Sequence, residues 1–395
     1  MTRRFLLSAA LALAISAIPL AAQNPLNPFD PAYKTWREQL ELGQQLRAEG
    51  KFEKAEESFV SALSQAERFG ATDVRFGACL NALALFYHSQ GNYTAAEPLY
   101  QKAIHVLDAA VGADHPDIGK VLSSLSALYV TMDRPGDAVP LAKRRVRIVE
   151  KSSGLNNPSL VAPLNALAFA SFLSGELTDA EAHQRRSIEI LNSSRAFATA
   201  DDATSMSSLS VILAAASKKP EAAGALEETL EIRRSLQDDA SLAAARDMAR
   251  LADAYADRFQ LSKAEALLRQ SLAIRETLAA QQNPEGAAAV NNLAEILRTQ
   301  GAVEQSEGLF RQALEIWTQV AGPDHVETAV SKHNLASVLR DGERYDEAAK
   351  LLEESLAALR VELGEQHPKV LQVAAAHRET VALSRTGVSQ VFDVR

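Results

Sequence analysis

Three histidines stand beside acidic residues in near-copies of one motif, a combination that could bind a metal ion or transfer protons. Residues 111–118 read VGADHPDI, residues 321–328 read AGPDHVET and residues 363–370 read LGEQHPKV. Imidazole and carboxylate groups are zinc ligands and also general acids and bases. Both kinds of site need several such groups close together, and these motifs lie far apart in the chain. The elements around them decide whether they serve chemistry or architecture.

No other motif in the sequence supports catalysis. No two of the 18 glycines lie closer than seven positions, which excludes the GxGxxG and GxxxxGK phosphate loops. HExxH, GxSxG and paired-cysteine metal spacings are also absent. Acidic pairs such as Glu56 with Glu57 lie beside basic residues and are typical of a solvated helix face. We therefore expect no catalytic residue, no metal ligand and no cofactor, although a repeat array can assemble a site without a local motif.

A repeat of 42 residues dominates the sequence and is typical of a helical array. Seven leucines, which we call the anchor leucines, recur at this spacing: Leu83, Leu125, Leu167, Leu209, Leu251, Leu293 and Leu335. Each is followed by a small residue, and a second small residue lies thirteen positions after each leucine, as in Ala84 and Ala96. Leu42, Gly43 and Ala55 form an eighth copy, offset by 41 residues.

Each repeat predicts a helical hairpin. In the second repeat an apolar helical stretch, ACLNALALFYHSQ, precedes the turn GNY and a second helical stretch, TAAEPLYQKAIHVLDAAV. The small residues allow the two helices to approach closely, because larger side chains would force them apart. A glycine is expected to end the first helix as a left-handed cap in four repeats, at Gly50, Gly91, Gly175 and Gly301.

The histidine motif keeps the same phase as the hairpins. Its capping position holds His115, Asn157, Asn283, His325 and His367, and proline follows four of these five residues. Proline suits the first turn of a helix, and the residue before it can cap that helix. The motif is therefore predicted to be the joint between successive hairpins, and the histidines serve architecture.

The order Leu83, Ala84, Tyr87, Gly91, Ala96, Tyr100, Ala103 resembles the tetratricopeptide repeat consensus. The longer 42-residue form, with NNLAEILRTQG and EGLFRQALEIW, resembles the repeats of kinesin light chain. The resemblance implies an all-α, right-handed superhelical solenoid of about eight helix-turn-helix hairpins over residues 33–363, a capping helix over 364–386 and a disordered tail over 387–395. HEAT or armadillo arrays, which have similar periods but lack this order, remain the second alternative.

The first 22 residues, MTRRFLLSAALALAISAIPLAA, have the basic start, apolar run and small residues of a signal peptide. Cleavage is expected after Ala22, followed by a linker over 23–32; a retained anchor is the alternative. We expect an exported bacterial-type protein, periplasmic or secreted, with no membrane span in the mature chain. Cleavage would change the formal net charge from −9 to −11, which disfavours nucleic acid as a partner. Cys79, the only cysteine, is expected in the core.

In tetratricopeptide arrays the first helices line a concave groove, which the resemblance implies for residues around the anchor leucines. The candidate partner-binding residues are Asn81, Asn165, Phe169, Phe172, Arg250, Asn291, Asn292, Arg298, Asn334 and Arg340. Asparagine amides can pair with a peptide backbone, and exposed aromatic side chains are typical anchors. The alternatives are asparagines that bond neighbouring hairpins and aromatic rings that pack between repeats.

These residues favour a non-enzymatic scaffold that binds an extended peptide or helix of another protein. Two other functions remain open: an assembly subunit that uses the edges of the solenoid, and a ligand-sensing or hydrolytic protein with a closed pocket. The sequence leaves the oligomeric state open.

Overall fold

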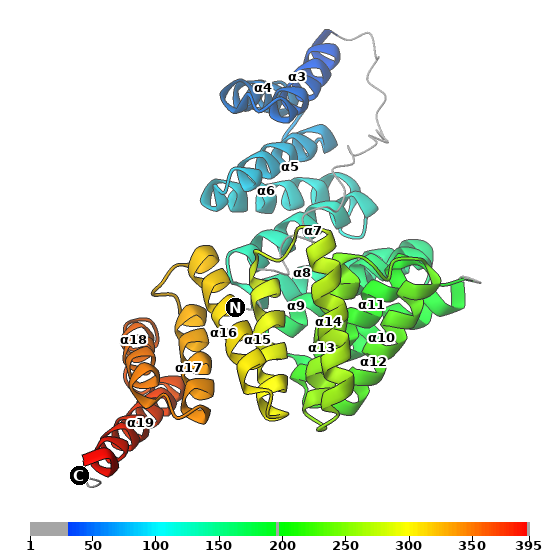
Figure 1. The fold of residues 1–395 in the computed structure, drawn as a ribbon. Helices are drawn as coiled ribbons and strands as arrows, with labels where there is room; N and C mark the ends of the chain where they lie inside the picture. The colour runs from blue at the N-terminus through cyan, green and yellow to red at the C-terminus, as the bar shows by residue number, and fades with distance from the viewer. Residues whose placement is uncertain (1–30, 195–196, 393–395) are drawn as a thin grey trace. The chain divides into compact units, whose positions relative to one another are not determined.

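The computed structural model describes residues 31–194 and 197–392, and every element in these ranges is a helix (Figure 1). The predicted signal peptide at 1–22, residues 23–30 of the predicted linker and residues 393–395 lie outside the described residues. The chain divides into two compact units, Met1–Phe197 and Ala198–Arg395, which we call unit 1 and unit 2.

The described part of unit 1 is a series of four antiparallel helical hairpins. The first helices of these hairpins are α3 (Pro31–Ala48), α5 (Val74–Ser89), α7 (Pro116–Thr131) and α9 (Val161–Leu173), and the short 3-10 helix η1 (Pro158–Leu160) precedes α9. The second helices are α4 (Phe52–Glu67), α6 (Tyr93–Val111), α8 (Pro135–Ser153) and α10 (Leu177–Ser194). Residues 31 and 32, expected in the linker, already belong to α3, because proline is favoured at the start of a helix.

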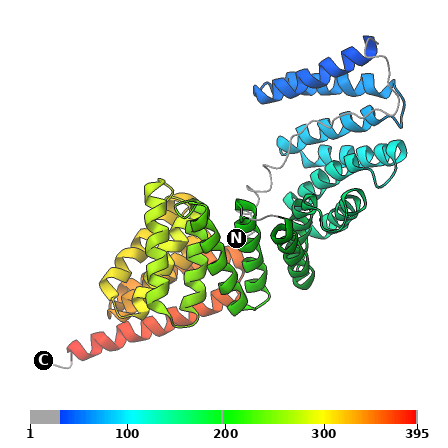
Figure 2. The same ribbon diagram turned by 90° about the vertical axis from the view of Figure 1, so that its right-hand side faces the viewer.

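Unit 2 continues with four hairpins and a final helix, as Figures 1 and 2 show. The first helices are α11 (Ala200–Ala215), α13 (Leu242–Ala256), α15 (Pro284–Thr299) and α17 (Val326–Asp341). The second helices are α12 (Lys219–Ser235), α14 (Leu261–Thr277), α16 (Val303–Ala321) and α18 (Tyr345–Leu363), followed by α19 (Pro368–Phe392). The predicted all-α solenoid of helix-turn-helix hairpins is confirmed.

The helix α19 packs on α18 and projects beyond the other helices of unit 2 (Figure 2). It extends past residue 386, so residues 387–392, which were expected in a disordered tail, continue the helix. This stretch contains no proline, and its single glycine costs a helix only about 1 kcal/mol. On α19 the positions that correspond to the anchor leucine and to the small residue after it hold His377 and the exposed Arg378. These larger polar side chains leave no room for a second helix to pack closely on α19.

The two helices of a hairpin approach closely at the predicted small residues. The Ser126 hydroxyl donates to the backbone oxygen of Ala138 at 3.4 Å, and the Ser306 hydroxyl donates to that of Ala294 at 2.8 Å. In the first repeat a Cβ on Gly43 would lie only 2.9 Å from the Phe59 ring. A larger side chain at these positions would therefore separate the helices.

The turn after each first helix contains one residue in the left-handed region, as the repeat predicts. Glycine occupies it at Gly50, Gly91, Gly175 and Gly301. Four other repeats place side-chain-bearing residues there at the same phase, namely Asp133, Ser217, Phe259 and Glu343, with φ between 56° and 61°. The left-handed turn is thus kept even where the sequence lacks the glycine that favours it.

The joints between hairpins confirm the architectural interpretation of the histidine motif. The backbone N–H groups of Asp117 and Glu327 donate to Nδ1 of His115 and His325 at 3.3 and 3.1 Å. Asp73, Asn157 and Asn283 cap their helices through side-chain oxygens, and His367 Nδ1 accepts the backbone N–H of Lys369. Thr199 and Ser241 occupy the N-cap position in two further joints of this phase. These side chains satisfy amide groups that the start of a helix leaves without partners.

The core of each unit runs between the helices as a chain of buried apolar clusters. Cys79 is 1% exposed and accepts a hydrogen bond from the Trp36 indole Nε1 at 2.9 Å. Burial raises the pKa of the Cys79 thiol to about 12, although the bond from Trp36 opposes this shift. The expectation of a core cysteine is confirmed.

Candidate functional site

The side of each first helix that faces away from its second helix is the candidate binding surface. The side chain of the anchor leucine packs into the hairpin. Because a helix has 3.6 residues per turn, the side chains one position before and two positions after this leucine lie on roughly the opposite side of the first helix. We call the surface formed by these positions and their helical neighbours the first-helix face. Its chemical character differs between the two units.

On α5, α7 and α9 of unit 1 the first-helix face is mainly apolar, whereas on α3 the corresponding positions hold Glu41 and Gln44. Its defining positions hold Ala82 and Leu85 on α5, Ser124 and Ala127 on α7, and Ala166 and Phe169 on α9. All of these side chains keep some contact with solvent. Phe172, one turn after Phe169, is also half-buried. The two rings that the sequence identifies as candidate anchors therefore lie on one helix and are neither fully enclosed nor free.

The two candidate asparagines of unit 1 lie closer to the hairpin interior. Asn81 is 7% exposed, and its Oδ1 atom has no hydrogen-bond partner among the described residues. Asn165 accepts a hydrogen bond at 3.0 Å from Nε2 of Gln184, a buried residue on α10. Gln184 stands at the repeat position where Tyr100 and Phe310 place aromatic rings in the core, so Asn165 supports the polar group in the core of its own hairpin.

In unit 2 the first-helix face is polar, and its side chains bond from one hairpin to the next. The Asn334 amide donates to Oδ1 of Asn291 at 2.8 Å, linking α17 to α15. Asn292 donates in turn to Oδ1 of Asp253 at 2.7 Å, linking α15 to α13. The structure therefore brings the three asparagines of unit 2 into contacts between neighbouring hairpins.

The candidate arginines of unit 2 make similar bonds between hairpins. Arg298 Nη1 donates to Oδ2 of Asp341 at 2.8 Å, and Arg298 also pairs with Glu295 on its own helix. Arg340 Nη2 donates to Oε2 of Glu379 on α19 at 2.9 Å. Much of the hydrogen-bonding capacity of this face is therefore used within unit 2.

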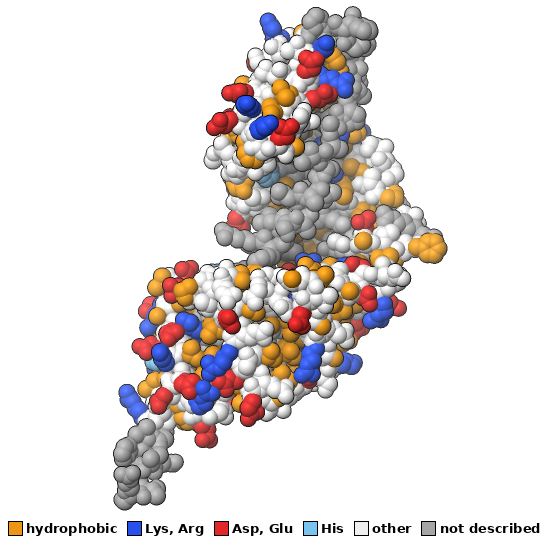
Figure 3. Space-filling view, turned by 45° about the horizontal axis from the view of Figure 1, so that its top comes forward, with side chains coloured by type: hydrophobic (Ala, Val, Ile, Leu, Met, Phe, Trp, Pro, Cys, Tyr) orange, Lys and Arg blue, Asp and Glu red, His pale blue; other side chains and the backbone are white. Residues whose placement is uncertain are grey.

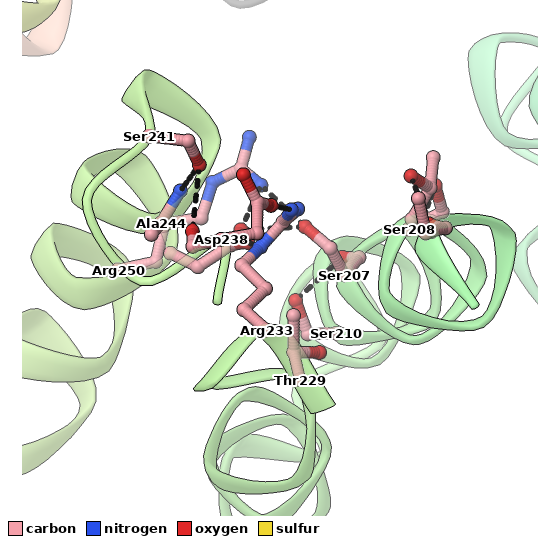
Figure 4. Close-up of polar contacts among 12 residues, drawn as sticks. Ser207, Ser208, Ser210, Thr229, Arg233, Asp238, Ser241, Ala244 and Arg250 are labelled. Carbon is pink, nitrogen blue, oxygen red and sulfur yellow. Dashed lines mark hydrogen bonds and ion pairs between the residues drawn. The ribbon is translucent and has the colours of Figure 1, made fainter. Parts of the chain in front are cut away.

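Arg250 belongs to a buried polar network at the junction of α11, α12 and α13 (Figure 4). Its Nη1 donates to the Ser207 hydroxyl at 3.3 Å, and that hydroxyl donates to Oδ1 of Asp247 at 2.6 Å. Arg233 donates from Nε to Oδ2 of Asp247 at 2.9 Å and from Nη1 to Oδ2 of Asp238 at 2.7 Å. Asp247 is 0% exposed, so its charge depends on these donors.

Asp253 lies one turn after Arg250 on the same face. Its side chain contacts solvent, yet the surrounding protein desolvates the carboxyl and raises its pKa to about 6. The nearby charge of Asp257 contributes in the same direction, whereas the bond from Asn292 and the charge of Arg250 oppose it.

The sequence interpretation missed the buried arginines of unit 2. Arg233 and Arg275 occupy the same repeat position, 5% and 1% exposed, where Leu107, Leu191 and Leu359 stand in other repeats. Arg275 donates to Oε2 of Glu285 at 2.9 Å. A comparison of each repeat position across the eight copies could have revealed these two polar exceptions.

The described residues contain no group of three or more histidine, cysteine, aspartate or glutamate side chains that could hold a metal ion. A groove of about 530 Å³ lies between α12 and α14 and is lined by residues such as Leu251, Tyr255 and Leu267. It contains none of the candidate residues. Over the described part of the chain, no helix is both long and apolar enough to cross a membrane.

Sequence profiles described as tetratricopeptide repeat match residues 75–151, 203–236, 248–285 and 286–360, together more than half of the chain. A comparison with curated proteins found no match. The solved structure of BtubC (BKLC) from P. vanneervenii is 18% identical with a TM-score of 0.51, covering 59% of this chain and 94% of that chain.

Two further solved structures are similar. A STAND signal transduction ATPase with a tetratricopeptide repeat sensor from Pyrococcus horikoshii is 13% identical with a TM-score of 0.59, covering 85% of this chain and 48% of that chain. TPR-like repeats assigned to a kinesin light chain of Podosopora anserina are 21% identical with a TM-score of 0.48, covering 54% of this chain and 99% of that chain.

At these identities the two structures with TM-scores above 0.5 establish the fold alone. The profile matches, the hairpins and the order of anchor leucine, small residues and left-handed turn identify the repeat type. The chain therefore belongs to the tetratricopeptide repeat proteins.

Proposed function

We propose that this chain is a non-enzymatic scaffold that binds an extended segment or a helix of another protein on the first-helix face of unit 1. Tetratricopeptide repeat proteins generally mediate protein–protein interactions, and solenoids bind partners along extended surfaces. The observation that carries the proposal is the apolar character of this face, where Leu85, Phe169 and Phe172 all retain contact with solvent. Half-buried aromatic side chains of this kind are typical hot spots of binding.

The contrast with unit 2 supports this location. There, Asn291, Asn292, Asn334, Arg298 and Arg340 already bond to neighbouring hairpins. A peptide would have to compete for these groups, whereas unit 1 offers apolar surface whose burial stabilises a complex by about 25 cal/mol per Å². The formal net charge of −9 and the mixture of acidic and basic side chains on the face shown in Figure 3 disfavour nucleic acid as the partner.

The test is selection of a random peptide-display library on the full chain and on the double variant Phe169→Ala/Phe172→Ala. We expect apolar peptides to bind the native chain and to lose about 2–4 kcal/mol of binding free energy on the double variant. Phe259→Ala, which removes an exposed ring from unit 2, is the matched control and should leave binding unchanged.

Two outcomes would contradict the proposal. Equal binding to native chain and double variant would place the partner elsewhere. A loss of about 3–5 kcal/mol of unfolding free energy for each truncation would show that the rings belong to the core.

We also propose that the chain is exported, on the basis of the basic, apolar and small-residue order of residues 1–22. A fusion of residues 1–30 to a reporter should be exported and processed near Ala22. Retention of the fusion in the cytoplasm would contradict this proposal.

A further inference from the structure

Arg233 and Arg275 occupy equivalent places in two successive joints of unit 2, between α12 and α13 and between α14 and α15. Five residues after each arginine, the backbone N–H groups of Asp238 and Ala280 donate to the carbonyl oxygens of Arg233 and Arg275 at 2.9 and 2.8 Å. The residue before each of these donors lies in the left-handed region, with φ of 57° and 50°. The two joints therefore share one backbone conformation, and their side chains can be compared directly.

In the first of these joints two acidic side chains satisfy the buried arginine. Arg233 donates from Nε to Asp247 at 2.9 Å and from Nη1 to Asp238 at 2.7 Å (Figure 4). In the second joint both aspartates are replaced by alanine, at Ala289 and Ala280, each 42 positions further along the chain. Ala289 is 1% exposed, so the place of the first missing carboxylate lies in the interior.

The same two nitrogen atoms that bond to aspartates in Arg233 are without partners in Arg275. Its Nε and Nη1 atoms are fully enclosed and have no hydrogen-bond partner among the described residues. Its Nη2 atom donates to Oε2 of Glu285 at 2.9 Å. The loss of the two aspartates from this joint therefore leaves two buried N–H donors that point to where carboxylates stand in the preceding joint.

The second joint also has an excess of positive charge. The other oxygen of Glu285, Oε1, lies 3.7 Å from Nη1 of Arg246, so this carboxylate serves two guanidinium groups. The Nε atom of Arg246 is likewise enclosed and unpartnered among the described residues. Arginine stays protonated in proteins, and a buried charge without a counter-charge is costly. Water would satisfy the free N–H groups of Arg275, but it would not balance the charge.

We propose that a small monovalent anion, chloride, binds to Nε and Nη1 of Arg275 in the place of the two missing carboxylates. Hydrogen bonds from a charged donor to an anion are strong, and one negative charge balances Arg246, Arg275 and Glu285. A carboxylate carried by another protein is excluded here, because Arg275 is only 1% exposed. The ion would join α14 to α15 as a structural ligand of unit 2, independently of the proposed function.

The first test measures how chloride affects the stability of the full chain. The response is the change in urea midpoint when sodium chloride replaces sodium gluconate, whose anion is too large for the site, at a constant ionic strength of about 0.15 M. Arg275→Leu removes the donors, and Ala289→Asp supplies the carboxylate that Arg233 already has. Arg258→Ala, which removes an exposed arginine of unit 2, is the matched control.

We expect the native chain and Arg258→Ala to gain more from chloride than Arg275→Leu and Ala289→Asp. The difference should correspond to about a threefold to tenfold fall in the unfolding equilibrium constant, because chloride would bind only the folded chain. The same response in all four chains would be a general salt effect and would overturn the inference. If one of the two site variants does not fold, the comparison of the other with Arg258→Ala decides.

The second test locates the ion by X-ray diffraction from crystals of the full chain grown in sodium bromide. Bromide has the charge of chloride and scatters anomalously, so a peak is expected within hydrogen-bonding distance of Nε and Nη1 of Arg275. Crystals of Ala289→Asp should lack this peak. Peaks at exposed residues alone would indicate an adventitious ion only, and that result or water at the site would overturn the inference.

Discussion

Arg275 donates from Nη2 to Oε2 of Glu285 at 2.9 Å, and this pair joins the second helix of one hairpin, α14, to the first helix of the next, α15. Arg275 is 1% exposed, and its Nε and Nη1 atoms have no partner among the described residues. The joint between these hairpins thus contains an incompletely satisfied buried cation. Glu285 is partly exposed, so water can hydrate it if the pair is lost.

Arg275→Leu, which introduces the residue found at this position in three other repeats, should raise the unfolding free energy by about 1–4 kcal/mol. Apolar replacements of buried ion pairs have this effect when they fill the same volume. Arg275→Ala, the control, should lower it by about 2–5 kcal/mol because it leaves a cavity. Urea unfolding followed by circular dichroism measures both, and a less stable leucine variant would show that the ion pair is a net stabiliser.

Phe259→Gly should stabilise the chain by about 0.5–1 kcal/mol. Phe259 has φ of 57° and a side chain that is 84% exposed, at the turn position that holds glycine in four repeats. A side chain in this region costs about 1–2 kcal/mol, partly offset by the greater freedom of glycine in the unfolded chain. Phe259→Ala removes the ring but keeps the Cβ, so its unfolding midpoint should stay near the native value. Equal gains in unfolding free energy for Phe259→Gly and Phe259→Ala would show that the exposed ring, and not the left-handed backbone conformation, lowers the stability of the native chain.

Asp253→Asn should increase stability above pH 6 and leave it unchanged near pH 3. The folded chain raises the pKa of this carboxyl to about 6, so ionisation costs stability as pH rises from the unfolded value of about 4 through 6. We expect a gain of about 1 kcal/mol at pH 7, because solvent contact screens much of the penalty. Unfolding midpoints across pH 3–8 measure it, with the exposed Asp324→Asn as control. A difference in stability between Asp253→Asn and the native chain that does not vary with pH would rule out ionisation of Asp253 as its cause.

His325→Ala should destabilise unit 2 by about 1 kcal/mol, the usual effect of losing an N-cap. His325 Nδ1 accepts the backbone N–H of Glu327 at 3.1 Å, and alanine leaves that amide without its acceptor. His325→Asn should retain near-native stability, because Asn157 and Asn283 cap the equivalent helices in other joints. Thermal unfolding of the three chains gives the comparison. Equal losses for alanine and asparagine would mean that the imidazole contributes packing rather than capping.

The sequence by itself determined the hairpins, their order and their joints. The anchor leucines, the small residues, the left-handed turns and the capping residues recur at one spacing, and each acts through a few neighbouring residues. Helix capping and backbone conformation are local properties, so a repeated pattern is enough to predict them. For this reason the histidine motif could be assigned to architecture from the sequence alone.

Tertiary structure decided which candidate side chains pair and which stay open. Asn334 and Asn291 lie 43 positions apart, and only the stacking of α17 on α15 brings the amide of one to the oxygen of the other. Phe169 and Phe172 could have been core or surface, and their half-burial depends on packing that no local pattern encodes. In the sequence, Arg145 is one of several basic residues on a predicted helix. Its missing counter-charge follows from the positions of all neighbouring carboxylates, because pairing depends on distances between side chains from different helices rather than on residue type.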